Sequence, residues 1–210
     1  MKIIKIDKFI SVTDDVLLLS QNMCGFEKFA SNNPIQKTLT DLAKLLGGNM
    51  AWALCGGLAV GVRVKPRGTE DVDIVIENDA IIDNVVNLTK SLFRHNRFHA
   101  LVHKQTGVEV DLITPEFVKV DSAIVLTAIN TATDTTLSDI VVPTVTQEGL
   151  IALKLGRGST QDIADVESVV KRYKNVNLSQ YNLGEKEKKL LEKIKKKVSG
   201  EVVHNEKEII

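Results

Sequence analysis

The stretch that decides the fold is residues 52–76, Trp-Ala-Leu-Cys-Gly-Gly-Leu-Ala-Val-Gly-Val-Arg-Val-Lys-Pro-Arg-Gly-Thr-Glu-Asp-Val-Asp-Ile-Val-Ile. A short apolar run ends at two adjacent glycines, and small residues follow. A second apolar run then begins with two carboxylates. This pattern predicts a strand over about 50–55, a helix over 58–63 and a second strand over about 71–77. Carboxylates at the start of a buried strand indicate a functional site in addition to the strand itself.

Asp71 and Asp73 open the second predicted strand with one valine between them. Alternate residues of a strand point to the same face, so these two side chains project together while Val72 points to the core. Two neighbouring carboxylates repel each other unless a positive charge lies between them. Carboxylate oxygens are typical ligands of hard divalent cations, so the pair predicts a magnesium site. The alternative is that both carboxylates only cap a neighbouring turn.

Gly56 and Gly57 lie at the predicted strand-to-helix turn that precedes the carboxylates. A glycine backbone lets a phosphate approach closely, and the amides of the following helix N-terminus point toward such an anion. The two glycines therefore predict a phosphate contact. Tight packing of the strand against the helix is the alternative.

A third carboxylate, Asp111, lies in the apolar run Val-Glu-Val-Asp-Leu-Ile over residues 108–113. Residues 98–103 and 108–113 together predict a hairpin that turns at Gln105-Thr106-Gly107. An acidic residue in an apolar strand is costly unless it is paired or binds a cation. If this strand lies beside the first carboxylate strand, all three carboxylates converge; otherwise Asp111 is a partnered residue at a sheet edge.

The remaining elements are predicted from periodicity, caps and breakers. Residues 2–20 predict a short strand followed by a helix, and Pro34 begins an amphipathic helix that ends before Gly47-Gly48. Asp79 caps a helix over about 80–93. Further strands are expected near 122–129 and 137–142, and helices at about 146–156, 160–173 and 185–198. We expect a core over 1–142 with an N-terminal helical extension, and a C-terminal helical segment over 143–210 that packs on it.

The composition is that of a globular chain of 210 residues, with 43% hydrophobic and 26% charged residues. Basic and acidic residues number 27 each, so no global charge attracts nucleic acid, and aromatic residues at 4% weaken a base-stacking platform. The two cysteines, Cys24 and Cys55, lie in apolar surroundings and are expected to be reduced core residues. No signal peptide or long apolar span is present, so we expect a cytoplasmic protein with no membrane partner.

Three carboxylates, a glycine turn and magnesium fit phosphoryl or nucleotidyl transfer better than acid–base hydrolysis. One or two metal ions about 3.5–4 Å apart can activate an attacking hydroxyl and stabilise a pyrophosphate leaving group. In this interpretation Asp71 and Asp73 hold the metal, and Asp111 completes its shell or acts as a base.

With these residues in the order Gly56-Gly57, Asp71-Val72-Asp73-Ile74 and Asp111, the sequence resembles the nucleotidyltransferase superfamily with the DNA polymerase β-type fold. More narrowly, Gly-Gly-Leu-Ala-Val followed by Arg67-Gly-Thr-Glu-Asp-Val-Asp looks like the abortive-infection nucleotidyltransferase toxins and their uncharacterised relatives. The stretch from Lys154 through Arg157 to Asp162 and Asp165 is similar to the helical motif of that branch. The resemblance covers about 50–172.

The resemblance implies an α+β fold, in which helices flank a mixed β-sheet. It also implies two magnesium ions and a nucleoside triphosphate such as ATP, whose nucleoside monophosphate is transferred to a hydroxyl or phosphate. The acceptor is an RNA, a protein or a small molecule, and the toxin branch implies an antitoxin partner. Little chain follows residue 175 to form a separate acceptor domain. A second hypothesis is therefore an inactive nucleotide-binding or interaction protein that keeps the fold.

Further residues have a functional or a structural interpretation. Arg67 contacts the triphosphate or pairs with a site carboxylate, and Thr69 is a nucleotide ligand or only a turn hydroxyl. Lys154 either reaches the triphosphate or extends to solvent, whereas Arg157, Asp162 and Asp165 are expected to form an ion-pair network between two helices. His99 and His103 lie in a predicted strand, where their spacing does not form a metal pair. The lysine-rich run 185–197 is a solvated helix face or an RNA contact.

Overall fold

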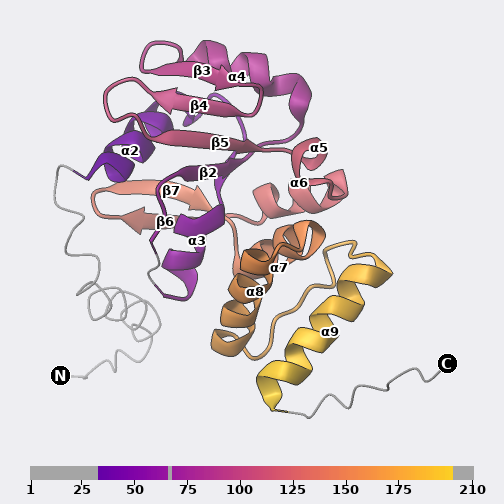
Figure 1. Cartoon of the computed structure of the whole chain (residues 1–210). Coiled ribbons are helices and arrows are strands. Elements are labelled where there is room, and N and C mark those ends of the chain that lie inside the picture. Colours follow the sequence, from indigo (N-terminus) through magenta and orange to yellow (C-terminus); the bar gives the residue numbers. More distant parts are fainter. Residues whose placement is uncertain (1–32, 66–67, 201–210) are drawn as a thin grey trace, which may run out of the picture.

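The computed structural model describes residues 33–65 and 68–200, and its centre is a mixed β-sheet (Figure 1). The strand and helix expected over residues 2–20 lie outside the described residues, as do Cys24 and Arg67. The sheet has the order β3-β4-β5-β2-β1-β7-β6. Its strands are β1 (Ala53–Leu54), β2 (Val72–Val75), β3 (Phe93–Arg97), β4 (Ala100–His103), β5 (Glu109–Ile113), β6 (Thr133–Leu137) and β7 (Ile140–Thr144).

The opening stretch supplies the centre of this sheet. β1 pairs antiparallel with β2 and parallel with β7, so it joins the two halves, and β2 pairs parallel with β5. The hairpin of β4 and β5 is present as the sequence predicts, and β3 extends it at the sheet edge. Both parallel and antiparallel pairs occur, which confirms the predicted mixed sheet.

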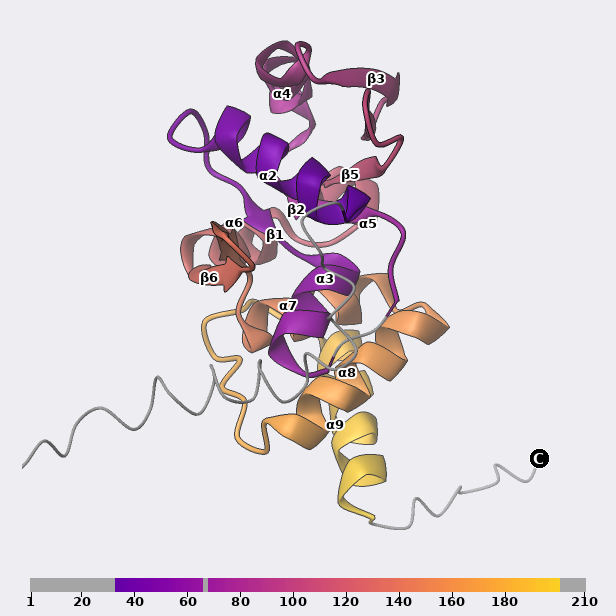
Figure 2. The same cartoon turned by 90° about the vertical axis from the view of Figure 1, so that its left-hand side faces the viewer.

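Helices flank the sheet. They are α2 (Pro34–Leu46), α3 (Gly56–Arg63), η1 (Asp79–Ile81), α4 (Ile82–Thr89), α5 (Pro115–Val118) and α6 (Ser122–Asn130). Of these, α2 and α3 contact strand β2 of the sheet. The Asn33 side chain caps α2, and Leu39, Leu42 and Leu46 bury its apolar face, as the spacing predicts. Figure 2 shows α4 above α2, and the two helices are in direct contact.

The C-terminal part consists of α7 (Gln147–Arg157), α8 (Thr160–Arg172) and α9 (Glu185–Ser199), which lie below the sheet in Figure 1. These three helices match the predicted ones closely. The Thr146 hydroxyl caps α7, and Ser159 with Asp162 forms a capping box at the start of α8. α7 packs on α3 and α6, so the helices contact the sheet half of the molecule. The division into two parts at residue 142 stays a prediction.

One of the predicted strands is wrong, and a second is only partly correct. The segment expected as a strand over 122–129 is helix α6, because Asp121 caps its first turn and Ile124, Val125 and Ala128 bury one helical face. The strand expected over 137–142 is partly correct, because residues 140–142 belong to β7 and Leu137 ends β6, but Ser138 and Asp139 form the turn between these two strands. Ser138 adopts the left-handed conformation at this turn, with φ of 57°.

The helix expected over 80–93 is shorter than predicted and has a different cap. Asn78, not Asp79, accepts the capping hydrogen bond, and the α-helix ends at Thr89. Residues from Phe93 form strand β3, which the sequence reading missed because only Phe93 of that strand is buried. An edge strand whose other side chains are polar and exposed carries no apolar alternation.

No helix among residues 33–65 and 68–200 combines the length and apolar character that crossing a membrane requires.

Candidate active site

The parallel pairing of β2 with β5 brings the three predicted carboxylates together. Asp73 lies directly opposite Asp111 in the register, and Asp71 immediately precedes β2. One oxygen from each of the three carboxylates lies within 4.8 Å of the others. All three side chains are partly exposed, whereas Val72 is fully buried on the opposite face. Strand alternation therefore places the acidic side chains at one opening of the sheet.

The Cys55-Gly56-Gly57 turn lies directly against Asp73. Gly56 has a φ of +60°, and a Cβ atom added there would lie 1.7 Å from the Asp73 Oδ2 atom. The Gly57 amide donates a hydrogen bond to the same oxygen over 3.3 Å. The first glycine is therefore required by backbone conformation and by the close carboxylate, and the second supplies an amide donor at the N-terminus of α3.

A cavity of about 760 Å³ opens over this turn and the carboxylates. The cavity is lined by nearly all the residues that the sequence predicts for the site, namely Gly56, Gly57, Thr69, Asp71, Asp73, Asp111 and Lys154. Cavity residues that the prediction missed include Cys55, Gly68, Glu70, Ile113 and Gln161. The volume lies in the range of small-molecule sites.

The electrostatics of the site show an excess of negative charge. Burial, and then the charge of Asp71, raise the pKa of Asp73 to about 6. Burial also raises the pKa of Asp111, although the Arg97 guanidinium partly opposes this. The buried Cys55 thiol has its pKa raised well above its ordinary value by burial and by the nearby Asp73 charge. A cation at this position would relieve the repulsion among the carboxylates.

Arg97 is a cation at the site that the sequence reading missed. Its guanidinium lies 3.2 Å from the Asp111 carboxylate and 2.5 Å from Glu109, and its side chain is 60% exposed. Arg97 ends β3 and pairs with Ala100 of β4, and Ala100 pairs with Asp111 of β5. This approach depends on the pairing of β3 with β4, and the sequence reading did not predict β3.

Thr69 and Lys154 line the cavity but already have protein partners. The Thr69 hydroxyl donates to the Asp71 carboxylate over 2.6 Å, so it orients that carboxylate. The Lys154 ammonium lies 3.1 Å from Asp162 and 2.7 Å from Asp165. This lysine is buried, so it does not extend to solvent. It holds its charge at the floor of the cavity, where it lowers the pKa of Asp73 against the effect of burial.

The ion-pair network expected between α7 and α8 is confirmed. Asp162 is buried and also accepts hydrogen bonds from Arg157 over 2.9 Å and from the Ser159 hydroxyl over 2.6 Å. Burial works against ionisation of Asp162, but the hydrogen bonds from Ser159 and Arg157 outweigh it and hold its pKa below the ordinary value. The network fixes α8 against the cavity floor.

His99 and His103 have separate partners, as the strand prediction requires. His99 lies 2.8 Å from Asp79 and stacks on the Phe117 ring, whereas the buried His103 lies 3.2 Å from Asp41. Among residues 33–65 and 68–200, the three aspartates are the only group of His, Cys, Asp and Glu side chains arranged to hold a metal ion.

The donor set at the three aspartates fits a hard divalent cation. It offers oxygen ligands only, their negative charges are not fully compensated, and the space in front of them is open. Magnesium prefers carboxylate oxygens and keeps part of its shell for water or phosphate, which the open cavity allows.

A comparison with one solved structure supports a nucleotidyltransferase fold. The chain is similar to an antigenic nucleotidyltransferase-like protein from Paracoccidioides brasiliensis, with 21% sequence identity and a TM-score of 0.52. The match covers 77% of this chain and 87% of that one. A second structure, ANT(2")-Ia in complex with adenylyl-2"-tobramycin, matches at 11% identity and a TM-score of 0.45, over 77% of this chain and 97% of that one. No protein-family model and no curated protein matches the sequence.

Proposed function

Because the chain has a nucleotidyltransferase fold, we propose that it is a magnesium-dependent nucleotidyltransferase. It would transfer a nucleoside monophosphate from a nucleoside triphosphate, such as ATP, to a hydroxyl or phosphate. The observation that carries this proposal is the convergence of Asp71, Asp73 and Asp111 at the mouth of a cavity bordered by the Gly56-Gly57 turn. Carboxylate ligands for a metal ion beside a glycine turn at a helix N-terminus are parts that suit the transfer of a phosphorus group.

The three carboxylates would hold the magnesium ions. When bound, these ions neutralise the charge of the triphosphate and increase the acidity of an attacking hydroxyl. Asp73 is central in this arrangement because it lies between Asp71 and Asp111 and against the glycine turn. Asp111 is the residue best placed to take a proton from the acceptor, since it has a raised pKa and a partly exposed carboxylate.

The glycine turn and the cavity floor would bind the triphosphate. Gly56 and Gly57 at the start of α3 line the cavity, and the positive end of this helix favours an anion there. The Lys154 ammonium would add positive charge from the floor, and Thr69 would act through the orientation of Asp71. Arg67 lies outside the described residues, and its contact with the triphosphate stays a prediction.

The second candidate is a nucleotide-binding protein without turnover. The Arg97–Asp111 ion pair favours it, because this pair neutralises the third carboxylate without a metal ion. In an active enzyme that guanidinium must release Asp111 when metal and nucleotide bind. Both candidates therefore predict that nucleotide binds, but only the first predicts product after addition of an acceptor. An antitoxin partner stays a prediction for either candidate.

The proposal is tested with nucleoside triphosphates that carry a radioactive α-phosphate, added with magnesium to the protein and a cell extract. The wild type is compared with Asp73→Asn and with Asp134→Asn, a matched change at an exposed aspartate in β6. We expect labelled product with the wild type and Asp134→Asn, and none with Asp73→Asn. Treatment of the product with ribonuclease or protease then identifies the acceptor class.

Equal labelling by the wild type and Asp73→Asn would contradict the proposal. Magnesium-dependent nucleotide binding by the wild type without any labelled product would favour the second candidate.

A further inference from the structure

Helix α9 carries a stripe of lysines that the proposed active site does not use. Lys186, Lys189, Lys193 and Lys197 recur at intervals of three and four residues, which places them on one side of the helix. All four are exposed, and we call them the lysine stripe. The acidic residues of this helix lie elsewhere, where Glu185 pairs with Lys188 and Glu192 pairs with Lys195. The helix therefore separates a balanced side from a positively charged side.

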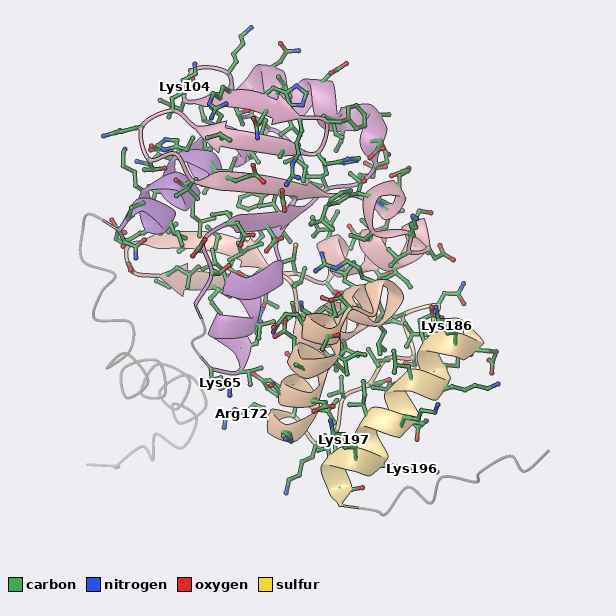
Figure 3. The ribbon with its side chains drawn as sticks, viewed as in Figure 1. Lys65, Lys104, Arg172, Lys186, Lys196 and Lys197 are labelled. Atoms are coloured by element: carbon green, nitrogen blue, oxygen red, sulfur yellow. The ribbon has the colours of Figure 1, made fainter. Side chains whose placement is uncertain are left out.

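The lysine stripe continues onto the end of α8. Lys197 forms an ion pair with Glu167 of α8, so the last turn of α9 lies beside α8. The last turn of α8 then presents Lys171 and Arg172, both exposed. Figure 3 shows Arg172, Lys196 and Lys197 at the same end of the molecule.

The end of α3 adds a further cation to this surface. The Tyr173 hydroxyl, just past α8, donates to the backbone carbonyl of Arg63 over 2.6 Å, which fixes the ends of the two helices together. Lys65 follows the end of α3 and is exposed, and Figure 3 places it near Arg172. Lys65, Lys171 and Arg172 form none of the salt bridges found within the described part of the chain.

We propose that the lysine stripe, with Lys171, Arg172 and Lys65, binds the phosphate backbone of a nucleic acid. The chain as a whole has equal numbers of basic and acidic residues, so this local concentration of positive charge is not a consequence of overall composition. The stripe runs over the 12 residues from Lys186 to Lys197, or about 16 Å of helix, which matches several successive phosphates of a nucleic acid. Lysines that contact phosphates carry no information about the base sequence, so we expect binding without sequence preference.

An anionic membrane is a less suitable partner for the same charges. A helix that lies on a membrane needs a free apolar face to enter the lipid boundary. The apolar face of α9 is already buried, with Leu191 and Ile194 only 5% and 3% exposed against the neighbouring helices. The surface therefore carries positive charge but has no free apolar side chains that could enter a membrane.

The position of the surface connects it with the active site. Gln161 and Asp162 in the first turn of α8 line the cavity, and Arg172 ends the same helix. The distance along the helix from Asp162 to Arg172 is about 15 Å. A nucleic acid held at the surface could therefore place a chain end in the cavity within a few nucleotides. Its use as the acceptor rests on the proposed function, whereas its binding does not.

Binding is measured by fluorescence anisotropy with a labelled 20-nucleotide RNA hairpin and a DNA duplex of similar charge, without nucleoside triphosphate. The double variant Lys189→Gln/Lys193→Gln removes two charges of the lysine stripe. Lys188→Gln/Lys195→Gln removes two charges from the balanced side of the same helix and is the matched control. Circular dichroism verifies that both variants keep the wild-type helix content.

We expect the stripe variant to bind about 10-fold more weakly than the wild type, and the control to bind within about 2-fold. With about four phosphate contacts, wild-type affinity falls roughly 100-fold between 50 and 200 mM salt. The comparison of the two probes shows whether RNA or DNA is preferred. Equal weakening in both variants, no weakening in either, or equal binding to phosphatidylserine vesicles would overturn the proposal.

The Asp73→Asn variant separates this proposal from the proposed function. It should bind the hairpin as the wild type does, because Asp73 is not part of the surface, even if transfer is lost. If the wild type binds nucleic acid but shows no transfer activity, the proposal of a nucleic-acid surface is supported and the proposed enzymatic function is contradicted.

Discussion

Replacement of Asp73 by asparagine should stabilise the metal-free protein while it removes activity. Burial and the charge of Asp71 raise the pKa of Asp73 from 3.8 to about 6. Between these two values the folded state binds more protons than the unfolded state, so the free energy of unfolding falls as the pH rises. Stability is lost progressively from about pH 4 to pH 6 and stays lower at higher pH.

The size of the effect follows from the two pKa values. Their difference corresponds to about 3 kcal/mol at pH 7.5, and the open cavity reduces this to roughly 1–3 kcal/mol through solvent screening. A gain of this size raises the melting temperature of a domain of this length by roughly 3–10 °C. Asparagine keeps an oxygen that can accept the hydrogen bond from the Gly57 amide, so the comparison isolates the charge.

The assay is thermal unfolding in EDTA at pH 7.5 and pH 4.5, with Asp134→Asn as the control for loss of an exposed aspartate. We expect Asp73→Asn to melt higher than the wild type at pH 7.5, with a difference of about one third of that value at pH 4.5. Magnesium should then raise the melting temperature of the wild type more than that of the variant. A variant that melts at or below the wild-type temperature at pH 7.5 without metal would refute the electrostatic argument.

Three further changes test the parts around the carboxylates. Arg97→Gln removes a cation that competes for Asp111, so Mn²⁺ affinity without nucleotide should rise by about 2–5-fold in titration calorimetry, and weaker binding would count against the competition. Gly56→Ala places a Cβ atom against Asp73 at a φ of +60°, so both melting temperature and metal affinity should fall, and a variant with wild-type values would show that the turn adapts freely. Asp162→Ala breaks a buried ion pair, so unfolding should become easier by about 3–5 kcal/mol in urea denaturation, and a loss below about 1 kcal/mol would assign the network no structural role.

The part of the fold that the sequence predicts well is the part with strong local signals. Asn33 before Pro34, Thr146 and Ser159 mark helix starts by their capping hydrogen bonds, and the predicted helices begin within a residue or two of them. The convergence of the three carboxylates was expected only on the condition that two strands are neighbours. The parallel register of Asp73 with Asp111 satisfies that condition, and no local pattern encodes it.

The errors arise where local patterns are ambiguous. The apolar run 122–129 suits a buried strand as well as a helix, and the Asp121 cap together with packing against α7 decides for the helix. Strand β3 has mostly polar residues, so its existence depends on pairing with β4 and not on its own composition. Arg97 enters the site only through this pairing, which explains why reading motifs one at a time missed it.

The central claim is that Asp71, Asp73 and Asp111 together hold the metal ions of a nucleotide site. Electron paramagnetic resonance with Mn²⁺ and a non-hydrolysable ATP analogue measures this directly, by counting the ions bound per chain. We expect two ions with the wild type and with Asp134→Asn, and a loss of at least one with Asp73→Asn. Equal numbers of bound ions in the wild type and Asp73→Asn, or no bound ion in the wild type, would contradict the claim.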